Sequence, residues 1–346
     1  MKAAVFIEPG RIDVKDIPLT PCGPDDIIVK VHACGICGSD VRNFRAGLRK
    51  NVKGIVSQVM GHEFTGIVSE VGANATRYRI GDRIAAAPDV SCGQCWYCRR
   101  GLVNLCDDHR MLGVDWPGGF AEYVHLPGEV LERGMIHHVP EGLGLDDAAM
   151  SEPASSVIAA QANAGVGLGD TVLVLGDGPI GCLHLEVARA RGASRVFMSG
   201  AMRLKGAEAF APDLLMDATR DDVVGMAREA TGGLGADFAV CANPVAATQE
   251  QAVRAVRKRG TVIIFGGLPR NKPMTTLDSN RIHYGEIRVM GAFSYPAPIH
   301  RKALTAIRDG FITPGKYITM TLPLDETVRG FEAVLAGEAL KVLIKP

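Results

Sequence analysis

The 346-residue sequence predicts an α/β protein in which a β-rich domain accompanies a doubly wound parallel sheet. Up to about residue 150, Gly or Pro interrupts the chain every few positions between short β-rich runs such as Ile27–His32 and Phe64–Val71. From about residue 155, apolar runs alternate with helix-length segments, a pattern typical of parallel strands covered on both faces. At about 150 residues per domain, the length also favours two domains.

Apolar runs mark the strands of the predicted parallel sheet. They are Thr171–Leu175, Arg195–Ser199, Leu214–Asp217, Phe238–Cys241 and Thr261–Phe265. The run Ile287–Phe293 is expected to form the last strand of this sheet. After it we predict a helix over Arg301–Arg308 and a closing strand at Val342–Ile344.

Charge and composition narrow the class of protein. The 38 Lys and Arg residues balance 38 Asp and Glu residues, so the chain lacks the field that a nucleic-acid partner would require. The apolar run at the start of the chain is too short for a signal peptide, because it is interrupted by Glu8, Pro9 and Arg11. No later run approaches the about 18 apolar residues of a membrane helix. We therefore expect a soluble cytoplasmic protein with no membrane partner, where its nine cysteines would stay reduced.

A glycine-rich turn follows the first predicted strand of the parallel sheet. The run Gly176–Gly181 reads G-D-G-P-I-G and is followed by a predicted helix, which is the setting that gives G-x-G-x-x-G its meaning as a dinucleotide site. The helix N-terminus would offer free N–H groups to a pyrophosphate. The predicted cofactor-binding residues here are Gly176, Gly178, Pro179, Ile180 and Gly181. The alternative is a glycine-rich turn without a ligand.

The end of the second strand bears on the choice between NAD and NADP. NAD sites usually have an acidic residue there to bind the ribose hydroxyls, but this strand ends in Ser199–Gly200 and no acid occurs between Glu186 and Glu208. Arg203 follows closely, with Lys205 beyond it. We expect Gly200 and Arg203 to contact the cofactor and slightly favour NADP, with NAD bound through hydroxyls and backbone as the alternative.

Four cysteines are crowded into one short stretch. Cys92, Cys95 and Cys98 stand three residues apart, and Cys106 follows. Four thiolates at this spacing can close a tetrahedral zinc shell with no open position, so a structural zinc is predicted. An iron–sulfur cluster and a redox thiol pair are the alternatives.

A second group of potential metal ligands consists of Cys37, His62 and Glu63. Thiolate, imidazole and carboxylate together suit zinc, and fewer than four protein ligands would leave a position open to water or substrate. Taken singly, such a cysteine or histidine more often packs than binds metal; the combination points to a catalytic site.

These motifs occur in an order that resembles one family. They read GICGSD at Gly35–Asp40, GHE at Gly61–Glu63, GGFAEY at Gly118–Tyr123, SEP at Ser151–Pro153 and GDGPIG at Gly176–Gly181. Over essentially the whole chain, the sequence is similar to the zinc-containing medium-chain alcohol dehydrogenases, most closely to the branch of polyol (sorbitol-type) and threonine dehydrogenases. The resemblance implies a GroES-like catalytic domain of residues 1–154 and 291–346, with a structural zinc lobe at about 89–110. It also implies a Rossmann NAD(P)-binding domain of residues 155–290.

The resemblance further implies a set of zinc ligands. Cys37 and His62 would hold the catalytic zinc together with either Glu63 or Glu152, two carboxylates that may exchange as ligands, and a water would complete the shell. Cys34 also precedes Cys37 at C-x-x-C spacing, but the family pattern does not use it as a ligand, and we expect it to pack.

Two further residues are expected to assist catalysis, beside Glu63. Asp40 matches a position that orients the histidine ligand, although an Asp there can also cap a turn. Ser39 resembles the hydroxyl that receives the substrate proton, the alternative being a simple turn residue. A histidine that continues this relay in many relatives is replaced by Arg42, so the onward proton route is open.

The expected reaction is oxidation of a secondary hydroxyl of a polyol or sugar derivative to a ketone, by hydride transfer from a zinc-bound alkoxide to NAD or NADP. A threonine 3-dehydrogenase or other secondary alcohol dehydrogenase is the alternative, and a non-catalytic nucleotide or zinc sensor a remote one. Tyr295 is a candidate donor to a polyol, and the family suggests a homo-oligomer, a tetramer or dimer. A phosphate-bearing substrate would use extra cations, for which the candidates are Arg49, Lys50, His300 and Arg301.

Overall fold

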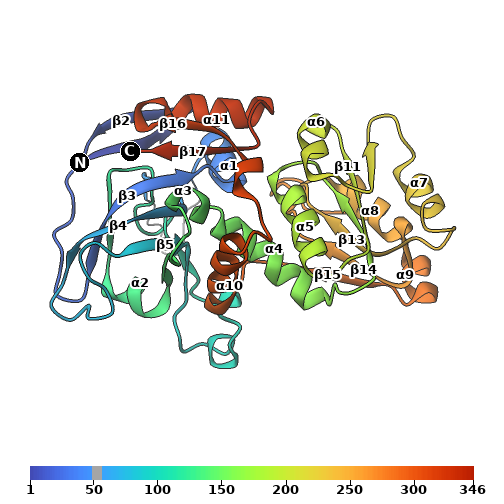
Figure 1. Cartoon of the computed structure of the whole chain (residues 1–346), viewed down its shortest axis with the longest axis horizontal. Helices are drawn as coiled ribbons and strands as arrows, with labels where there is room; N and C mark the ends of the chain where they lie inside the picture. Colours follow the sequence, from blue (N-terminus) through green and yellow to red (C-terminus); the bar gives the residue numbers. More distant parts are fainter. Residues whose placement is uncertain (49–56) are drawn as a thin grey trace. The chain divides into compact units, whose positions relative to one another are not determined.

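The computed structural model describes residues 1–48 and 57–346 (Figure 1). Within these residues the fold divides into two compact units. The first consists of Met1–Ser155 together with Tyr295–Pro346, and the second of Ser156–Ser294. Each unit has a sheet and a hydrophobic core of its own, so each site below can be built within one unit.

The first unit is organised around a sheet in which strands from both ends of the chain are neighbours. The order is β16-β17-β3-β4-β5-β9, and β8 also pairs with β3. The bounds are β3 Ile27–Gly35, β4 Glu63–Val71, β5 Arg83–Ala87, β8 Tyr123–Leu126, β9 Met135–His138, β16 Ile318–Pro323 and β17 Lys341–Lys345. β3 and β4 are antiparallel, with Gly35 opposite Glu63, so the motifs that follow β3 and precede β4 come together at one end of this pair.

Smaller elements complete the first unit. The strands are β1 Lys2–Glu8, β2 Arg11–Asp16, β6 Asp89–Val90 and β7 Arg110–Met111. The helices are α1 Gly38–Ala46, α2 Gly128–Arg133, α3 Leu145–Ala148, α4 Ser151–Ala164, which ends beyond the unit's boundary, α10 Ala297–Arg308 and α11 Thr327–Ala336. Three aromatic rings tie α1 and α11 to the core, because the ring centroid of Phe331 lies 4.9 Å from that of Phe44 and 5.9 Å from that of Phe120.

The second unit is a six-stranded parallel sheet in the order β12-β11-β10-β13-β14-β15. The strands are β10 Thr171–Leu175, β11 Arg195–Gly200, β12 Leu214–Asp217, β13 Ala236–Cys241, β14 Val256–Ile264 and β15 Arg288–Gly291. The helices are α5 Pro179–Ala190, α6 Leu204–Ala207, α7 Val223–Glu229, α8 Ala246–Ala255 and α9 Ser279–Gly285 (Figure 1). The strand order reverses between β10 and β13, and ligands of such folds bind outside the carboxyl ends of the strands at this point.

The fold class predicted from the sequence, α/β with a β-rich unit and a Rossmann-type sheet, is confirmed. The strands differ from the predictions mainly at their ends: β14 begins five residues before the predicted run Thr261–Phe265. The helix expected over Arg301–Arg308 begins earlier too, at Ala297, since Pro298 is acceptable in a first helical turn, where its missing N–H is not needed. The later helix α11 was not predicted. Within the described ranges, no helix is long and apolar enough to cross a membrane.

Candidate active site and metal centres

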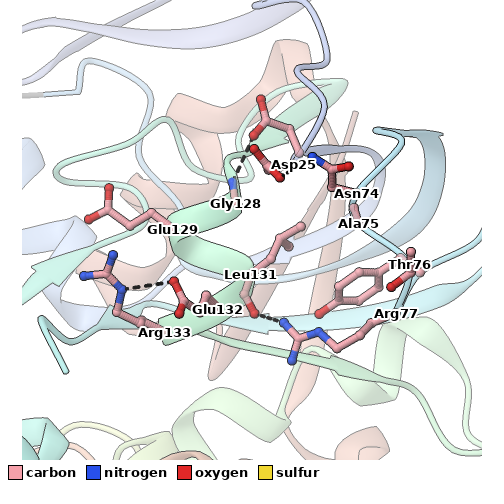
Figure 2. A pocket seen from close by; sticks show the side chains of 12 residues that line it. Asp25, Asn74, Ala75, Thr76, Arg77, Gly128, Glu129, Leu131, Glu132 and Arg133 are labelled. Carbon is pink, nitrogen blue, oxygen red and sulfur yellow. Dashed lines mark hydrogen bonds and ion pairs between the residues drawn. The ribbon is translucent and has the colours of Figure 1, made fainter.

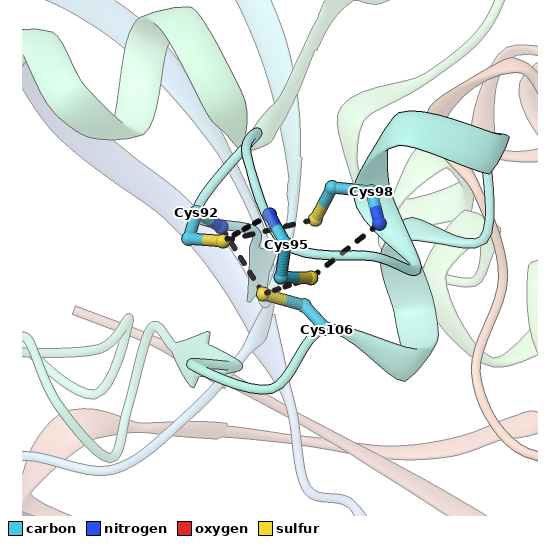
Figure 3. A group of neighbouring side chains, drawn as sticks. All are labelled: Cys92, Cys95, Cys98 and Cys106. Carbon is cyan, nitrogen blue, oxygen red and sulfur yellow. Dashed lines mark hydrogen bonds between the residues drawn. The ribbon is translucent and has the colours of Figure 1, made fainter.

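The four clustered cysteines lie on the loop that joins β6 to β7, and their sulfurs converge (Figure 3). All four Sγ atoms lie within 4.8 Å of one another. The Cys92–Cys98 and Cys95–Cys106 Sγ pairs are each 4.0 Å apart. A zinc–sulfur distance of about 2.3 Å gives a tetrahedron with sulfur–sulfur edges of about 3.8 Å, so the cage has the size that zinc requires.

Backbone N–H groups stabilise the thiolate forms of this cluster. The N–H of Cys95 donates to Cys92 Sγ at 3.3 Å and that of Cys92 to Cys106 Sγ at 3.2 Å. Hydrogen bonds from the N–H groups of Cys98 and Asp107 lower the pKa of Cys95 to about 6, whereas burial raises the pKa of Cys106 to about 12. A divalent cation would lower the pKa of all four thiols, Cys106 included, since it binds each sulfur as a thiolate.

The second group of ligands is assembled where β3 ends and β4 begins. Cys37 is the N-cap residue of α1, His62 directly precedes β4, and Glu63 is the first residue of that strand. One ligand atom from each of these three lies within 4.8 Å of the others. Gly61, with φ of +93°, makes this approach possible: a Cβ there would stand 2.7 Å from the buried Sγ of Cys34. Cys34 thus packs against the turn, and the described ligand group does not include it.

Asp40 contacts two members of this group. Its Oδ1 lies 3.3 Å from His62 Nδ1, and its Oδ2 accepts a hydrogen bond of 3.0 Å from the Cys37 N–H. Burial alone would lower the pKa of His62, but the Asp40 carboxylate and the Cys37 sulfur raise it well above its ordinary value. Because Asp40 engages Nδ1, Nε2 is left for a metal, and Ser39 Oγ lies 3.3 Å from that atom.

Glu63 is held by a cation from the other end of the chain. Its Oε2 accepts a hydrogen bond of 2.6 Å from Lys341 Nζ on β17, and both side chains are buried. Lys341 Nζ also donates to the carbonyl of Ile36 at 3.2 Å. Glu63 Oε1 is buried without a hydrogen-bond partner among the described residues. A buried acceptor of this kind needs a partner, and a metal ion beside Cys37 and His62 would provide one.

Glu152 is engaged by a partner outside this group. It lies in the first turn of α4, and its Oε1 accepts a hydrogen bond of 2.8 Å from the Tyr295 hydroxyl. Burial, with the nearby charge of Glu63, raises the pKa of Glu152 to about 7. The structure therefore brings Glu63, and not Glu152, together with Cys37 and His62.

The residues considered for substrate recognition differ in their exposure and in their contacts. The Tyr295 side chain is buried, and its hydroxyl donates to Glu152 Oε1. His300 is also buried, with its ring nitrogens 2.8 Å from His137 Nδ1 and 2.9 Å from Ser151 Oγ, and it does not serve as a phosphate-binding cation. Arg301 is exposed, whereas Arg49 and Lys50 lie outside the described residues.

The glycine-rich turn of the second unit joins β10 to α5. Gly176 has φ of +133°, which only glycine adopts readily, and Gly178 is the N-cap residue of the helix. Pro179 and Ile180 open α5. A Cβ on Gly181 would stand 1.9 Å from the Gly176 carbonyl oxygen, so helix and turn approach too closely for a side chain. This matches what a pyrophosphate-binding turn requires.

The adjoining strand end, β11, carries the other two predicted cofactor residues. Gly200 is the last residue of β11, and Arg203 is the N-cap residue of α6. The Asp177 carboxylate lies against both, accepting the Arg203 N–H at 2.5 Å. No sequence spacing indicated this contact.

A polar hollow of about 670 Å³ in the first unit is a separate feature (Figure 2). Asp25, Asn74, Arg77, Glu129 and Arg133 are among the residues that line it. None of the predicted metal or cofactor residues lines this hollow.

Comparisons with known proteins agree with these sites. Residues 23–140 match the alcohol dehydrogenase GroES-like domain, and residues 179–308 match the zinc-binding dehydrogenase domain. The chain is 33% identical to the D-arabitol-phosphate dehydrogenase of Enterococcus avium, over 95% of this chain and 92% of that protein. The chain belongs to the zinc-containing medium-chain alcohol dehydrogenase family.

Further similarities support this membership. The dehydrogenase is 30% identical to the sorbitol dehydrogenase of Halalkalibacterium halodurans, with 100% of this chain and 99% of that protein covered. A crystal structure of a Sinorhizobium meliloti 1021 protein bound to NADP superposes with a TM-score of 0.90 at 34% identity, over 100% of this chain and 99% of that one. The predicted family and the prediction of a zinc-dependent, NAD(P)-linked enzyme are thereby confirmed.

Proposed function

We propose that this dehydrogenase oxidises a secondary hydroxyl of a polyol, or of a phosphorylated polyol, to a ketone. The observation that carries the proposal is the group formed by Cys37, His62 and Glu63, a zinc-type donor set with fewer than four protein ligands. Similarity to the D-arabitol-phosphate and sorbitol dehydrogenases supports a polyhydroxylated substrate.

In this proposal Cys37, His62 and Glu63 hold the catalytic zinc, and Cys92, Cys95, Cys98 and Cys106 hold the structural one. Bound zinc lowers the pKa of a hydroxyl that it coordinates. Asp40 fixes the histidine ring through Nδ1, and Lys341 balances the charge of Glu63.

Ser39 receives the proton that the substrate hydroxyl releases, because its Oγ lies 3.3 Å from His62 Nε2, beside the ligand group. Arg42 is exposed on α1 and cannot accept a proton at working pH, so the proton leaves Ser39 by water. Replacing Arg42 by His should leave the pH–rate profile unchanged, whereas a large gain in rate would contradict this route.

The two units act as the functional domains in this proposal, with catalytic metal in the first and the nicotinamide dinucleotide on Gly176–Gly181 of the second. None of the nine cysteines, all of which lie among the described residues, forms a disulfide bond, which supports a reducing, cytoplasmic location. We also propose a homo-oligomer, as in the family, which light scattering after gel filtration would test.

The test is reduction of NAD+ or NADP+, followed at 340 nm, with a panel of polyols, polyol phosphates, simple secondary alcohols and L-threonine. A polyol or polyol phosphate should give the highest kcat/KM. A clear preference for L-threonine or a simple alcohol would overturn the substrate class. A protein that holds two zinc ions but reduces neither cofactor with any alcohol would be a sensor and not an enzyme.

Two variants of nearby cysteines separate the metal role from a packing role. Cys37→Ala should lower the zinc content from two to one per chain and abolish turnover, while NADH binding persists on the second unit. Cys34→Ala, three residues earlier, should retain both zinc ions, because Cys34 packs against Gly61. Retention of two zinc ions by the Cys37 variant would contradict the assignment.

A further inference from the structure

Asp177, at the second position of the glycine-rich turn, extends its side chain to the neighbouring strand end. Its Oδ2 accepts hydrogen bonds from the N–H of Met202 at 2.9 Å and from that of Arg203 at 2.5 Å. β10 and β11 are adjacent parallel strands with Leu175 opposite Ser199, so the residues that follow them meet at the same edge of the sheet. Asp177 is therefore an acid at the carboxyl edge of the sheet, beside the pyrophosphate turn.

The side chain of Asp177 occupies the space that a side chain at position 200 would take. A Cβ built on Gly200 would stand 2.2 Å from both Cβ and Cγ of Asp177, and 2.4 Å from its Oδ2. Only glycine fits at position 200 while Asp177 is present. The ends of β10 and β11 thus leave room for one side chain between them, and the carboxylate side chain of Asp177 fills that space.

The end of the second strand of the parallel sheet has a known binding role in dinucleotide-binding folds. An acid at the end of the second strand accepts hydrogen bonds from the adenosine ribose hydroxyls, and in this chain residues 187–207 contain none. The slight preference for NADP predicted from the sequence rested on that gap. The structure fills the gap from the other side, with a carboxylate contributed by the turn after the first strand.

We propose that Asp177 recognises the adenosine ribose and makes the enzyme prefer NAD over NADP, an inference that rests on the proposed function. Both loop N–H groups go to Oδ2, and an ionised carboxylate can accept about four hydrogen bonds, so capacity remains for ribose hydroxyls. A 2′-phosphate offers no hydroxyl at that position and brings negative charge, which the carboxylate repels.

A merely structural role for Asp177 has a different signature. If the carboxylate only ordered the loop that contains Met202 and Arg203, its loss would weaken the binding of NADH and of NADPH by the same factor. If it accepts hydrogen bonds from the ribose hydroxyls, its loss weakens NADH binding and removes a repulsion that opposes NADPH binding. The ratio of the two dissociation constants therefore separates the roles.

The experiment is fluorescence titration of the zinc-loaded enzyme with NADH and with NADPH, in the absence of substrate. The wild type should bind NADH more tightly. Asp177→Asn keeps the shape of the side chain and one acceptor oxygen, and should move the preference toward NADPH by about tenfold or more, the scale of a lost charged hydrogen bond.

Two further variants act as controls. Asp217→Asn removes an acid from the end of the next strand, where the carboxylate is engaged by Thr219 and Arg220, and should leave the preference unchanged. The pair Asp177→Gly with Gly200→Asp moves the carboxylate onto β11 and should restore the NADH preference that Asp177→Gly alone loses. This reciprocal design tests the site even if Asp177→Asn folds poorly.

Tighter NADPH than NADH binding by the wild type would overturn the inference while leaving the dehydrogenase function intact. Equal weakening of both cofactors by Asp177→Asn would also overturn it, in favour of loop ordering. Binding of neither dinucleotide by the wild type would instead refute the proposed function, and the inference with it.

Discussion

The buried ion pair between Lys341 and Glu63 permits a quantitative test of the metal site's construction. The Nζ and Oε2 atoms are 2.6 Å apart, and the two side chains are 4% and 1% exposed. Lys341→Met preserves the aliphatic stem but leaves the Glu63 carboxylate buried without its cation. Breaking a buried pair on one side costs about 3–5 kcal/mol of the free energy of unfolding.

The same strand supplies a matched control. Lys345 lies four residues further along β17, and its Nζ is 2.7 Å from Asp146 Oδ2, but those side chains are 37% and 41% exposed. Solvent screens this pair, so Lys345→Met should cost about 0–1 kcal/mol. The two variants differ in burial and hardly in the length of the ion pair.

Urea unfolding followed by tryptophan fluorescence is a suitable assay, because both tryptophans, Trp96 and Trp116, belong to the first unit. With an m-value of about 3 kcal/mol/M, Lys341→Met should lower the midpoint by about 1–2 M and Lys345→Met by at most about 0.3 M. All variants are compared after removal of zinc, since a bound metal ion adds stability and would supply a second cation to Glu63.

A double variant guards against a trivial effect of the methionine. Lys341→Met combined with Glu63→Gln removes the stranded charge and should recover at least half of the lost free energy relative to Lys341→Met alone. Equal midpoint shifts for Lys341→Met and Lys345→Met would refute the reasoning, because burial would then not govern the strength of these pairs.

Three further predictions follow from the metal sites and the nucleotide domain. Cys98→Ser should reduce the zinc content from two to one per chain by atomic absorption, whereas Arg99→Ser should retain both; two zinc ions in the cysteine variant would exclude the four-sulfur shell. Asp40→Asn should weaken zinc binding at His62 by about 10- to 100-fold in competition with a chelating dye, and unchanged affinity would show that Asp40 only caps α1. Burial lowers the pKa of His184 to about 3. Below pH 6.5 the histidine is therefore protonated in the unfolded chain and neutral in the folded protein, so the free energy of unfolding falls by up to about 1.4 kcal/mol per pH unit toward pH 3. Unfolding by circular dichroism at pH 7 and 5 should show a shallower loss for His184→Leu, and an identical loss would contradict the buried neutral form.

Local patterns in the sequence were enough to predict the features that depend on short spacing. Cys92, Cys95 and Cys98 lie on one loop, so their separation along the chain already limits their separation in space. The turn Gly176–Gly181 follows a strand and opens a helix, as predicted, because the backbone geometry of such a turn requires glycine at defined positions.

Contacts between distant segments could not be predicted in this way. Lys341 and Glu63 are 278 residues apart, and only the pairing of β17 with β3 and of β3 with β4 brings them together. The contact of Asp177 with Gly200 likewise depends on the lateral order of β10 and β11. Single-residue spacing contains no information about which strands become neighbours, so these partners became visible only in three dimensions.

The position of β17 has a consequence for the order in which the protein matures on the ribosome. β17 pairs with β3, one of the first strands to be made, yet its residues are translated after the whole of the second unit. Until then the Cys34–Gly35 end of β3 has one unpaired edge, since β8 pairs only with Ile27–Lys30, and Glu63 lacks the ammonium group that neutralises it. The parallel sheet of residues 156–294 can complete its folding first. We therefore expect nascent chains to acquire a competent dinucleotide fold before they acquire a finished metal centre.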